Sequence, residues 1–299
     1  MGTFTRDTMT SLYLPGLKAL LTLQFAKLPW IYKEFCKEIK MDKRTETVVS
    51  LYGIDTIPQA LEGAIHIYGD IHPGYTIAYT SLIYKYGLRA TKEAVEDDLY
   101  GAVSNFPEYL SRASRNTIEI IGHTLINNAF ATNLYDGVPL CSVSHPSIGG
   151  VLQANRPAAD ADLGVTSLKN AILNLKATKS WEGIPVVWNG GKLIYPIGSD
   201  ATVFELIRTE KVPYKADNEK NYLFNSLELV PTPYMTDSNA WIIVPKGDRS
   251  EGLKFAWRVG VTPTTDLDPD NDDHRFKLRF RCVVFVDEFR HTYGSSGST

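Results

Sequence analysis

Residues 65–88 read IHIYGDIHPGYTIAYTSLIYKYGL, and large apolar side chains in this stretch recur at every second position. Tyr75, Ile77 and Tyr79 would share one face of a strand, and the HPG sequence at 72–74 is typical of a turn. The pattern predicts a ribbon of two strands. Such a ribbon is at best marginally stable alone in water, so it must lie against another surface. One face is aromatic and the other mixed, which indicates contact with a partner.

Helical patterns follow this ribbon. Thr91 can cap a short helix, and Pro107 occupies the first-turn position that proline favours in a longer one. The longer pattern continues for about 25 residues, or roughly 37 Å, which is long for a globular helix. Its apolar positions recur every three or four residues. They are Leu110, Ala113, Thr117, Ile121, Leu125 and Ala129.

The first 60 residues have no long regular pattern. A helix is predicted from about Pro15, and a second short helix is predicted at 31–40. The first helix has an apolar stripe formed by Leu17, Leu20, Leu21 and Phe25. A membrane surface is one alternative partner for this stripe, but Lys18 and Lys27 make a thin basic face. Packing on the rest of the protein or on another copy is the favoured interpretation.

The second half of the chain predicts mainly strands. A helix that Thr166 or Ser167 can cap comes first, and a hairpin follows around the NGG sequence at 189–191. A short helix is predicted after Ser199. Four further strands are predicted at 227–230, 240–244, 253–261 and 276–286. Because helices and strands do not alternate strictly, the fold class is α+β with a mixed or antiparallel sheet.

The composition excludes several classes of protein. The chain has 299 residues, and 31 Lys plus Arg stand against 34 Asp plus Glu, which disfavours a basic nucleic-acid reader. The three cysteines lie far apart, which argues against a disulfide scaffold or a zinc knuckle. No run of about 18 apolar residues occurs, and the start does not resemble a secretory signal. A soluble cytosolic product is therefore expected.

The sequence contains only weak signals for catalytic and metal sites. Acidic residues alternate at 266–273, but the EF-hand positions for Gly and Glu are not filled, so a solvated turn is favoured over a cation site. His66, Asp70 and His72 lack a fourth ligand. His145 with a serine could suggest a hydrolase, but the chain has no G-x-S-x-G elbow. No catalytic residue, metal or cofactor is expected.

A set of short motifs lies along the chain. The motifs are GYT at 74–76 with Tyr79, GLRATKEA at 87–94, DDLY at 97–100, NNAF at 127–130, DGVPL at 136–140, SHP at 144–146, GIP at 183–185, DSNAW at 237–241 and RHTYGS at 290–295. Each motif is weak alone, but in this order and spacing the set resembles the major capsid proteins of tailed bacteriophages, the Hong Kong 97-like fold, and most closely the Mu-like and siphophage head-subunit group. The resemblance covers nearly the whole chain from about residue 10.

The resemblance implies a layout of the chain. Residues 1–62 would be an N-terminal arm, and residues 63–90 an extended β-hairpin loop that reaches across an adjacent subunit. Residues 91–164 and 266–299 would form a peripheral domain with the long helix as its spine. Residues 165–265 would form most of an axial domain around the five-fold and six-fold axes. Contacts between subunits are then expected at Tyr68, Tyr75, Ile77, Tyr79, Tyr84 and Arg89 of the loop, and at Leu17, Leu20, Leu21 and Phe25 of the arm.

The implied function is that of a major capsid protein, not an enzyme, which self-assembles through hexamers and pentamers into an icosahedral shell around phage double-stranded DNA. A portal protein and non-specifically held DNA are expected partners, and no membrane is. The loop begins after only about 60 residues, which leaves no room for a scaffolding segment, so a separate scaffolding protein is implied. The virion is the expected location, with assembly in the host cytoplasm.

Three other interpretations remain at this point. Some members of the group crosslink a loop lysine to another subunit, and Lys85 is the one loop lysine, but the residue type is too common to support a crosslink. A ring-forming tail or head-completion protein is the first alternative function, although the long helix after Pro107 counts against it. A hydrolase that uses His145 is the second.

Overall fold

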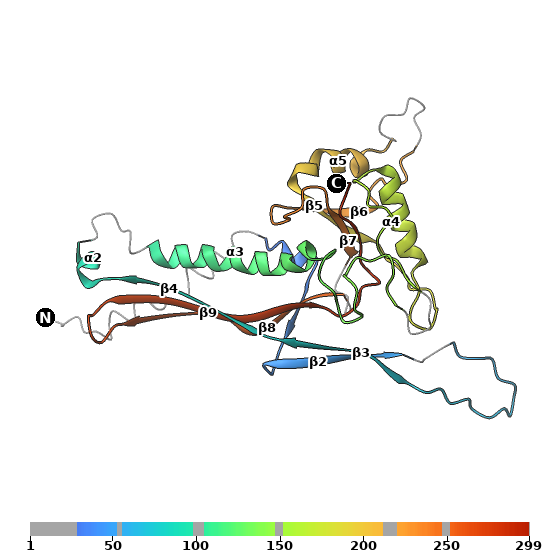
Figure 1. Cartoon of the computed structure of the whole chain (residues 1–299), viewed down its shortest axis with the longest axis horizontal. Coiled ribbons are helices and arrows are strands. Elements are labelled where there is room, and N and C mark those ends of the chain that lie inside the picture. Colours follow the sequence, from blue (N-terminus) through green and yellow to red (C-terminus); the bar gives the residue numbers. More distant parts are fainter. Residues whose placement is uncertain are drawn as a thin grey trace.

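The computed structural model describes residues 29–52, 56–97, 105–146, 152–211, 220–246 and 252–298. Within these ranges the strands form two four-stranded sheets and a separate two-stranded hairpin, with helices beside the large sheets (Figure 1). The strand orders are β1-β8-β9-β4, β10-β7-β5-β6 and β2-β3. The expected α+β class is confirmed.

The first large sheet runs alongside the longest helix, α3 (Phe106–Asn127), as Figure 1 shows. Apolar side chains alternate along β9 and are buried on the face that packs against α3. Thr91 accepts a hydrogen bond from the Ala94 N–H at the start of α2, so the predicted cap is confirmed. The strands and the short helix are β1 (Lys37–Lys40), β8 (Leu253–Leu267), β9 (His274–Val286), β4 (Leu82–Ala90) and α2 (Lys92–Glu96).

The second large sheet packs against two helices. β7 is buried on both of its faces, because Trp241 and Ile243 join the core with α4 and α5 while Ile242 and Val244 join the core with α3. A strand covered on both sides is expected to be apolar throughout, as WIIV is. The elements are β10 (Tyr293–Ser295), β7 (Trp241–Pro245), β5 (Gly191–Pro196), β6 (Leu227–Thr232), α4 (Val165–Ala177), η3 (Ile197–Ser199) and α5 (Asp200–Arg208).

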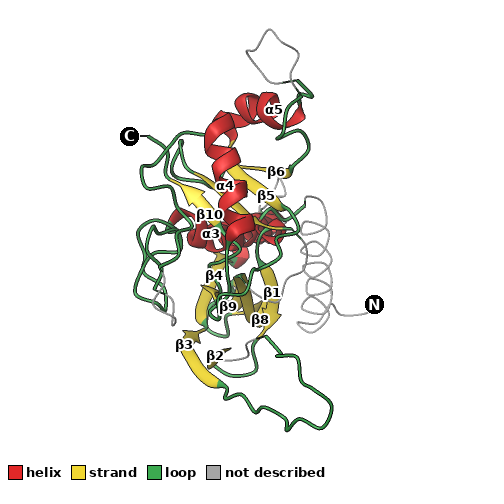
Figure 2. Cartoon of the chain, turned by 90° about the vertical axis from the view of Figure 1, so that its right-hand side faces the viewer, coloured by secondary structure: helices red, strands yellow, loops and turns green. Residues whose placement is uncertain are grey.

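The third sheet is a hairpin of β2 (Thr45–Tyr52) and β3 (His72–Thr80). It extends away from both large sheets in two perpendicular views (Figures 1 and 2). Its antiparallel register pairs Tyr52 with His72 at the outer end. Ser81 alone separates β3 from β4, so the chain passes from the hairpin directly into the first large sheet.

The predicted ribbon at 65–88 is wrong in its strand pairing. Both β3 and β4 lie in this stretch, but β3 pairs with β2 and β4 pairs with β9. The HPG sequence at 72–74 lies at the start of β3 and forms no turn. A period of two identifies strands but does not identify their partners, so two consecutive strands were mistaken for a hairpin.

Two shorter predictions are also wrong. The predicted helix at 31–40 contains only one short 3₁₀ turn, η1 (Tyr32–Glu34), before β1, which pairs in parallel with β8. The NGG sequence at 189–191 forms no hairpin, since β5 begins at Gly191 and pairs with β6 and β7. In each case pairing between distant segments overrides a local signal. The four strands predicted after residue 226 are confirmed as β6, β7, β8 and β9.

The buried face of α3 contains polar and very small residues. Glu119, Gly122 and His123 belong to this buried face. The buried face of α3 is therefore turned around the helix axis from the apolar stripe that the sequence predicts. Tyr32 packs on Gly122, where an added Cβ would lie 2.5 Å from the Tyr32 Cβ. His123 Nδ1 lies 2.7 Å from the Glu119 carbonyl oxygen, and His123 Nε2 lies 2.8 Å from the Thr232 hydroxyl. Nδ1 therefore donates and Nε2 accepts, which describes a neutral imidazole.

Gly122→Ala is expected to lower the free energy of unfolding by about 1–3 kcal/mol, because the new methyl group overlaps the buried Tyr32 side chain. Urea denaturation measures the change. Gly260→Ala is the matched control, since nothing lies within 4 Å of a Cβ at that position. Equal stability of the two variants would contradict the close packing of α3 against the segment at Tyr32.

The stability of the chain is expected to depend on pH through His123. Burial lowers the pKa of His123, so the unfolded chain binds this proton more readily than the folded chain. The stability that the neutral ring contributes is lost as the pH falls below the unfolded pKa of about 6.5. His123→Gln, which cannot take up the proton, should lose less free energy of unfolding between about pH 7 and pH 5 than the wild type. Urea titrations measure the free energy of unfolding of both proteins, and an equal loss in the two over this pH range would refute the prediction.

Candidate assembly surface

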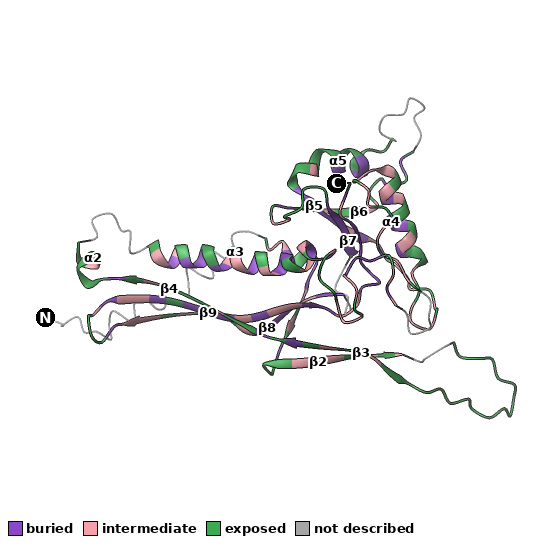
Figure 3. Cartoon of the chain, in the orientation of Figure 1, coloured by how far each residue is buried: buried purple, intermediate pink, exposed green. Residues whose placement is uncertain are grey.

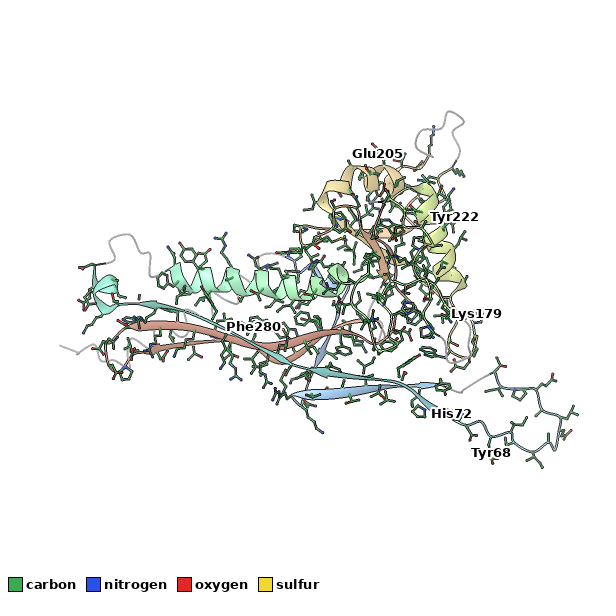
Figure 4. All side chains as sticks on the ribbon, in the orientation of Figure 1. Tyr68, His72, Lys179, Glu205, Tyr222 and Phe280 are labelled. Atoms are coloured by element: carbon green, nitrogen blue, oxygen red, sulfur yellow. The ribbon has the colours of Figure 1, made fainter. Side chains whose placement is uncertain are left out.

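The loop that joins β2 to β3 exposes a group of large apolar side chains. We call its described residues, 56–71, the hairpin tip. All of these residues are exposed, and Tyr68 stands far from the body of the molecule (Figures 3 and 4). Exposed apolar patches of this kind mark surfaces that another molecule covers. The apolar members are Ile57 (95% exposed), Leu61, Ile65, Ile67, Tyr68 (88% exposed) and Ile71.

The base of the hairpin, by contrast, is packed on its own chain. The Tyr79 ring stacks on Phe285 of β9 with centroids 3.9 Å apart, and its hydroxyl donates to Glu46 Oε2 at 3.0 Å. Burial and the neighbouring Glu46 raise the pKa of Tyr79 to about 12. Only 7% of Tyr79 is exposed, so most of its ring packs on its own chain, and contact with another subunit at this residue stays a prediction. The alternating sequence pattern predicted which side chains share a face of the strand, but it did not predict which residues pack against that face.

Tyr75 and Ile77 are half-buried against the body. The Tyr75 ring centroid lies 5.4 Å from that of Tyr135 and 5.5 Å from that of Trp181. Ile77 packs against the small core around Tyr79. These contacts set the direction in which the hairpin leaves the body.

Tyr84 and Arg89 lie in β4, and therefore in the first large sheet instead of the hairpin. The Tyr84 ring stacks on Phe280 with centroids 5.0 Å apart, and burial raises the Tyr84 pKa. Arg89 Nε forms an ion pair of 3.2 Å with Asp273. Among the six predicted loop residues, Tyr68 alone belongs to the hairpin tip.

The predicted arm contacts at Leu17, Leu20, Leu21 and Phe25 lie outside the described residues. The structure does show how the segment that begins at residue 29 is attached to α3. The Glu119 carboxylate accepts hydrogen bonds from the Ile31 and Tyr32 N–H groups at 2.9 and 3.1 Å. Arg115 donates to the Pro29 carbonyl oxygen at 2.7 Å and lies over the Trp30 ring. The apolar pattern of the helix does not predict this attachment, although a glutamate within a helical apolar face is a signal for a buried polar partner.

His145 has a structural environment in place of a catalytic one. Its side chain is fully buried, and Nδ1 lies 2.6 Å from Asp136 Oδ2. Nε2 faces the Leu140 carbonyl oxygen and Asn155 Oδ1, and the ring stacks on Phe289 with centroids 3.7 Å apart. No serine hydroxyl contacts either nitrogen in the described part of the chain. Among the described residues, these contacts hold the segment 136–146 to Asn155 and do not form a triad.

The remaining motifs do not gather into a metal site. No group of three or more His, Cys, Asp or Glu suited to a metal occurs among the residues that the structure describes. The turn predicted at 266–273 lies between β8 and β9, but it is only partly solvated. Asp268 and Asp273 are buried, and they pair with Arg275 and Arg89. All three cysteines are buried, and burial raises their pKa. In the described ranges no helix is long and apolar enough to cross a membrane.

Comparison with known proteins matches this chain to one protein family. A family model described as phage capsid protein matches residues 74–294. No curated protein matches the sequence significantly. Among solved structures, the procapsid of bacteriophage JBD30 aligns with a TM-score of 0.56 and 15% identity, over 99% of this chain and 77% of that chain.

Two further structures have the same fold. The capsid of the cyanophage P-SCSP1u aligns with a TM-score of 0.62 and 7% identity, over 91% of this chain and 89% of that chain. The structure named Mycobacterium phage Patience aligns with a TM-score of 0.60 and 11% identity, over 98% of this chain and 89% of that chain. Because the family model spans most of the sequence, the chain belongs to the phage capsid protein family, and it has the Hong Kong 97-like fold that its motifs indicate.

Proposed function

We propose that the hairpin tip is the part of this major capsid protein that joins one subunit to the next in the icosahedral shell. The observation that carries the proposal is the exposure of Ile57, Ile65 and Tyr68 on a hairpin tip that the described part of its own chain leaves uncovered. Burial of apolar area is worth about 25 cal/mol per Å², so each tip gains stability when a neighbouring copy covers it. A closed shell repeats the contact many times, so each one can be modest.

The strand pairing revises the proposed layout. The extended loop is better defined as 45–80, since β4 belongs to the sheet beside α3. The peripheral domain then contains α3 with the first large sheet, and the axial domain contains α4, α5 and the second. β10 brings Tyr293–Ser295 into that second sheet, although the sequence-based boundaries placed these residues in the peripheral domain.

We further propose hexamers and pentamers as the assembly units, with a scaffolding protein and a portal protein as partners and packaged double-stranded DNA held without sequence preference. The formal charge of −3 supports confinement of DNA in preference to tight phosphate binding. Assembly would take place in the host cytoplasm and end in the virion. The family match supports a shell over the alternative of a tail ring.

Removal of the hairpin tip should abolish assembly without unfolding the chain. Tyr52 and His72 are paired, so an Asn-Gly turn can replace residues 53–71 and close the hairpin. We expect this variant to remain soluble and folded, because all described side chains that it loses are exposed. Electron microscopy should show no particles under conditions in which the wild type forms them. Normal particles from the shortened chain would refute the proposal.

Substitutions at the tip of the hairpin should reduce assembly, whereas substitutions at its base should reduce the stability of the fold. Tyr79→Ala removes a buried, stacked ring and should lower the free energy of unfolding by about 3 kcal/mol. Tyr68→Ala should change it by less than about 0.5 kcal/mol, since the ring is exposed, but should reduce the yield of particles. Thermal melting and particle counts of both variants measure the two effects. The reverse order would place Tyr68 in the subunit core.

A further inference from the structure

A pocket of about 260 Å³ lies beside the C-terminal end of α4. Its walls are drawn from three segments, which are 152–155, 174–179 and 289–290, so no residue of the hairpin tip belongs to it. Lys179, labelled in Figure 4, stands at its rim where the chain leaves α4. One water molecule fills only a small part of such a volume. The pocket therefore has room for a larger polar group.

Arg290 brings a fixed guanidinium group to this pocket. Only 4% of the residue is exposed, and the guanidinium lies 3.7 Å from the centre of the Trp181 ring. Its Nε donates to the Lys179 carbonyl oxygen at 3.0 Å, and its Nη1 donates to both carboxylate oxygens of Glu288 at 2.8 Å. Nη2 is also buried, but it has no hydrogen-bond partner among the described residues. The group is thus held in one place with an unused donor.

Gln153 brings an unused acceptor to the same pocket. Its Nε2 donates to the Lys179 carbonyl oxygen at 3.0 Å, which identifies the other amide atom as the oxygen. That oxygen, Oε1, is buried and has no partner in the described part of the chain. Because Gln153 and Arg290 bind one carbonyl oxygen, their unused atoms belong to adjacent groups. Buried polar atoms are rarely left without a partner, so the pair indicates a ligand with both an acceptor and a donor.

The charge of the pocket favours an anionic ligand. Lys179 and Arg290 are basic, and none of the described residues that line the pocket is acidic. Glu288 offsets the charge of Arg290, so the charge of the exposed Lys179 side chain remains. A carboxylate that accepts from Arg290 Nη2 forms a charge-assisted hydrogen bond. Inorganic phosphate or sulfate matches the pocket less well, because its further oxygens would face Gln153 Oε1, which is itself an acceptor.

The last residue of a polypeptide carries a carboxylate and an amide N–H side by side. We propose that this pocket binds the C-terminal residue of another polypeptide. Its carboxylate accepts from Arg290 Nη2 and faces the Lys179 ammonium group, and its N–H donates to Gln153 Oε1. The exposed side chain of Leu152 lines the pocket and offers apolar contact to the preceding residue. The site shares no residue with the hairpin tip, so this inference goes beyond the proposed function and does not depend on it.

NMR titration of the full chain measures the binding, with the Arg290 Nε–H and Trp181 indole N–H signals as local reporters. N-acetylalanine has both groups of a C-terminal residue, whereas acetate lacks the N–H and N-acetylalaninamide lacks the carboxylate. N-acetylalanine should bind roughly tenfold more tightly than either, since each missing group leaves a buried partner unpaired. Equal binding of the three compounds, or no shift of the two signals, overturns the inference and leaves ordered water as the occupant.

Two substitutions test the groups separately. Gln153→Leu removes the acceptor and should lower the affinity for N-acetylalanine to that for acetate, with the binding of acetate unchanged. Lys179→Ala keeps the backbone carbonyl but removes the ammonium group, and it should weaken both carboxylates roughly threefold. Lys169→Ala is the matched control, since this lysine lies on α4 outside the pocket. Wild-type affinity in Lys179→Ala overturns the inference, and so does wild-type affinity in Gln153→Leu. The Lys179 variant decides alone if the Gln153 variant folds poorly.

A free N-acylated amino acid has the same chemistry as the end of a polypeptide, and a longer probe separates the two sources. The peptide acetyl-Gly-Gly-Ala should bind at least as tightly as N-acetylalanine, because the exposed rim at Leu152 lets the chain continue outside the pocket. Binding of N-acetylalanine without binding of the peptide overturns a polypeptide as the ligand. None of these measurements counts particles, so their failure is distinguishable from failure of the proposed function.

Discussion

A two-stranded hairpin with an apolar tip cannot bury that tip by itself, and this constraint explains much of the molecule. Among the described strands, β2 and β3 pair only with each other, and their outer ends extend beyond both large sheets. Water therefore contacts Ile65, Ile67 and Tyr68 in the single chain. The base of the same hairpin is held firmly, through Tyr79 on Phe285 and Tyr75 beside Trp181. A well-held base presents the uncovered tip in one direction, which favours binding to a neighbour over collapse onto the chain itself.

The sequence predicted the strands and helices better than their arrangement. Pro107 and the three-to-four-residue spacing after it located α3, and the period of two located β3, β4 and β9, because these patterns depend on local geometry. The partner of β3 was missed, since β2 lies in a segment without a strong pattern and pairs across the hairpin tip. Pairing depends on which distant strand offers a matching edge, and no local pattern records that.

The subunit contacts expected from the sequence stay predictions, but the structure shows which of the six loop residues pack on their own chain. Tyr68 is exposed as expected, but Tyr79 and Tyr84 stack on rings of β9. An aromatic residue on a strand has the same spacing whether it faces a neighbour or its own core. Glu119 and His123 were missed for a related reason, because a count of apolar positions ignores polar groups whose hydrogen bonds are satisfied inside the protein.

Residues 41–44 join β1 of the sheet beside α3 to β2, and Ser81 alone joins β3 to β4 of the same sheet. Its N–H donates to the Arg44 carbonyl oxygen at 2.9 Å, and its hydroxyl accepts from Arg281 at 3.1 Å. Because one buried residue joins the two strands, a change in the direction of β3 is passed directly to β4. The hairpin is therefore connected to both edge strands of the sheet beside α3, β1 and β4. The tilt of the hairpin and the twist of the sheet beside α3 therefore change together.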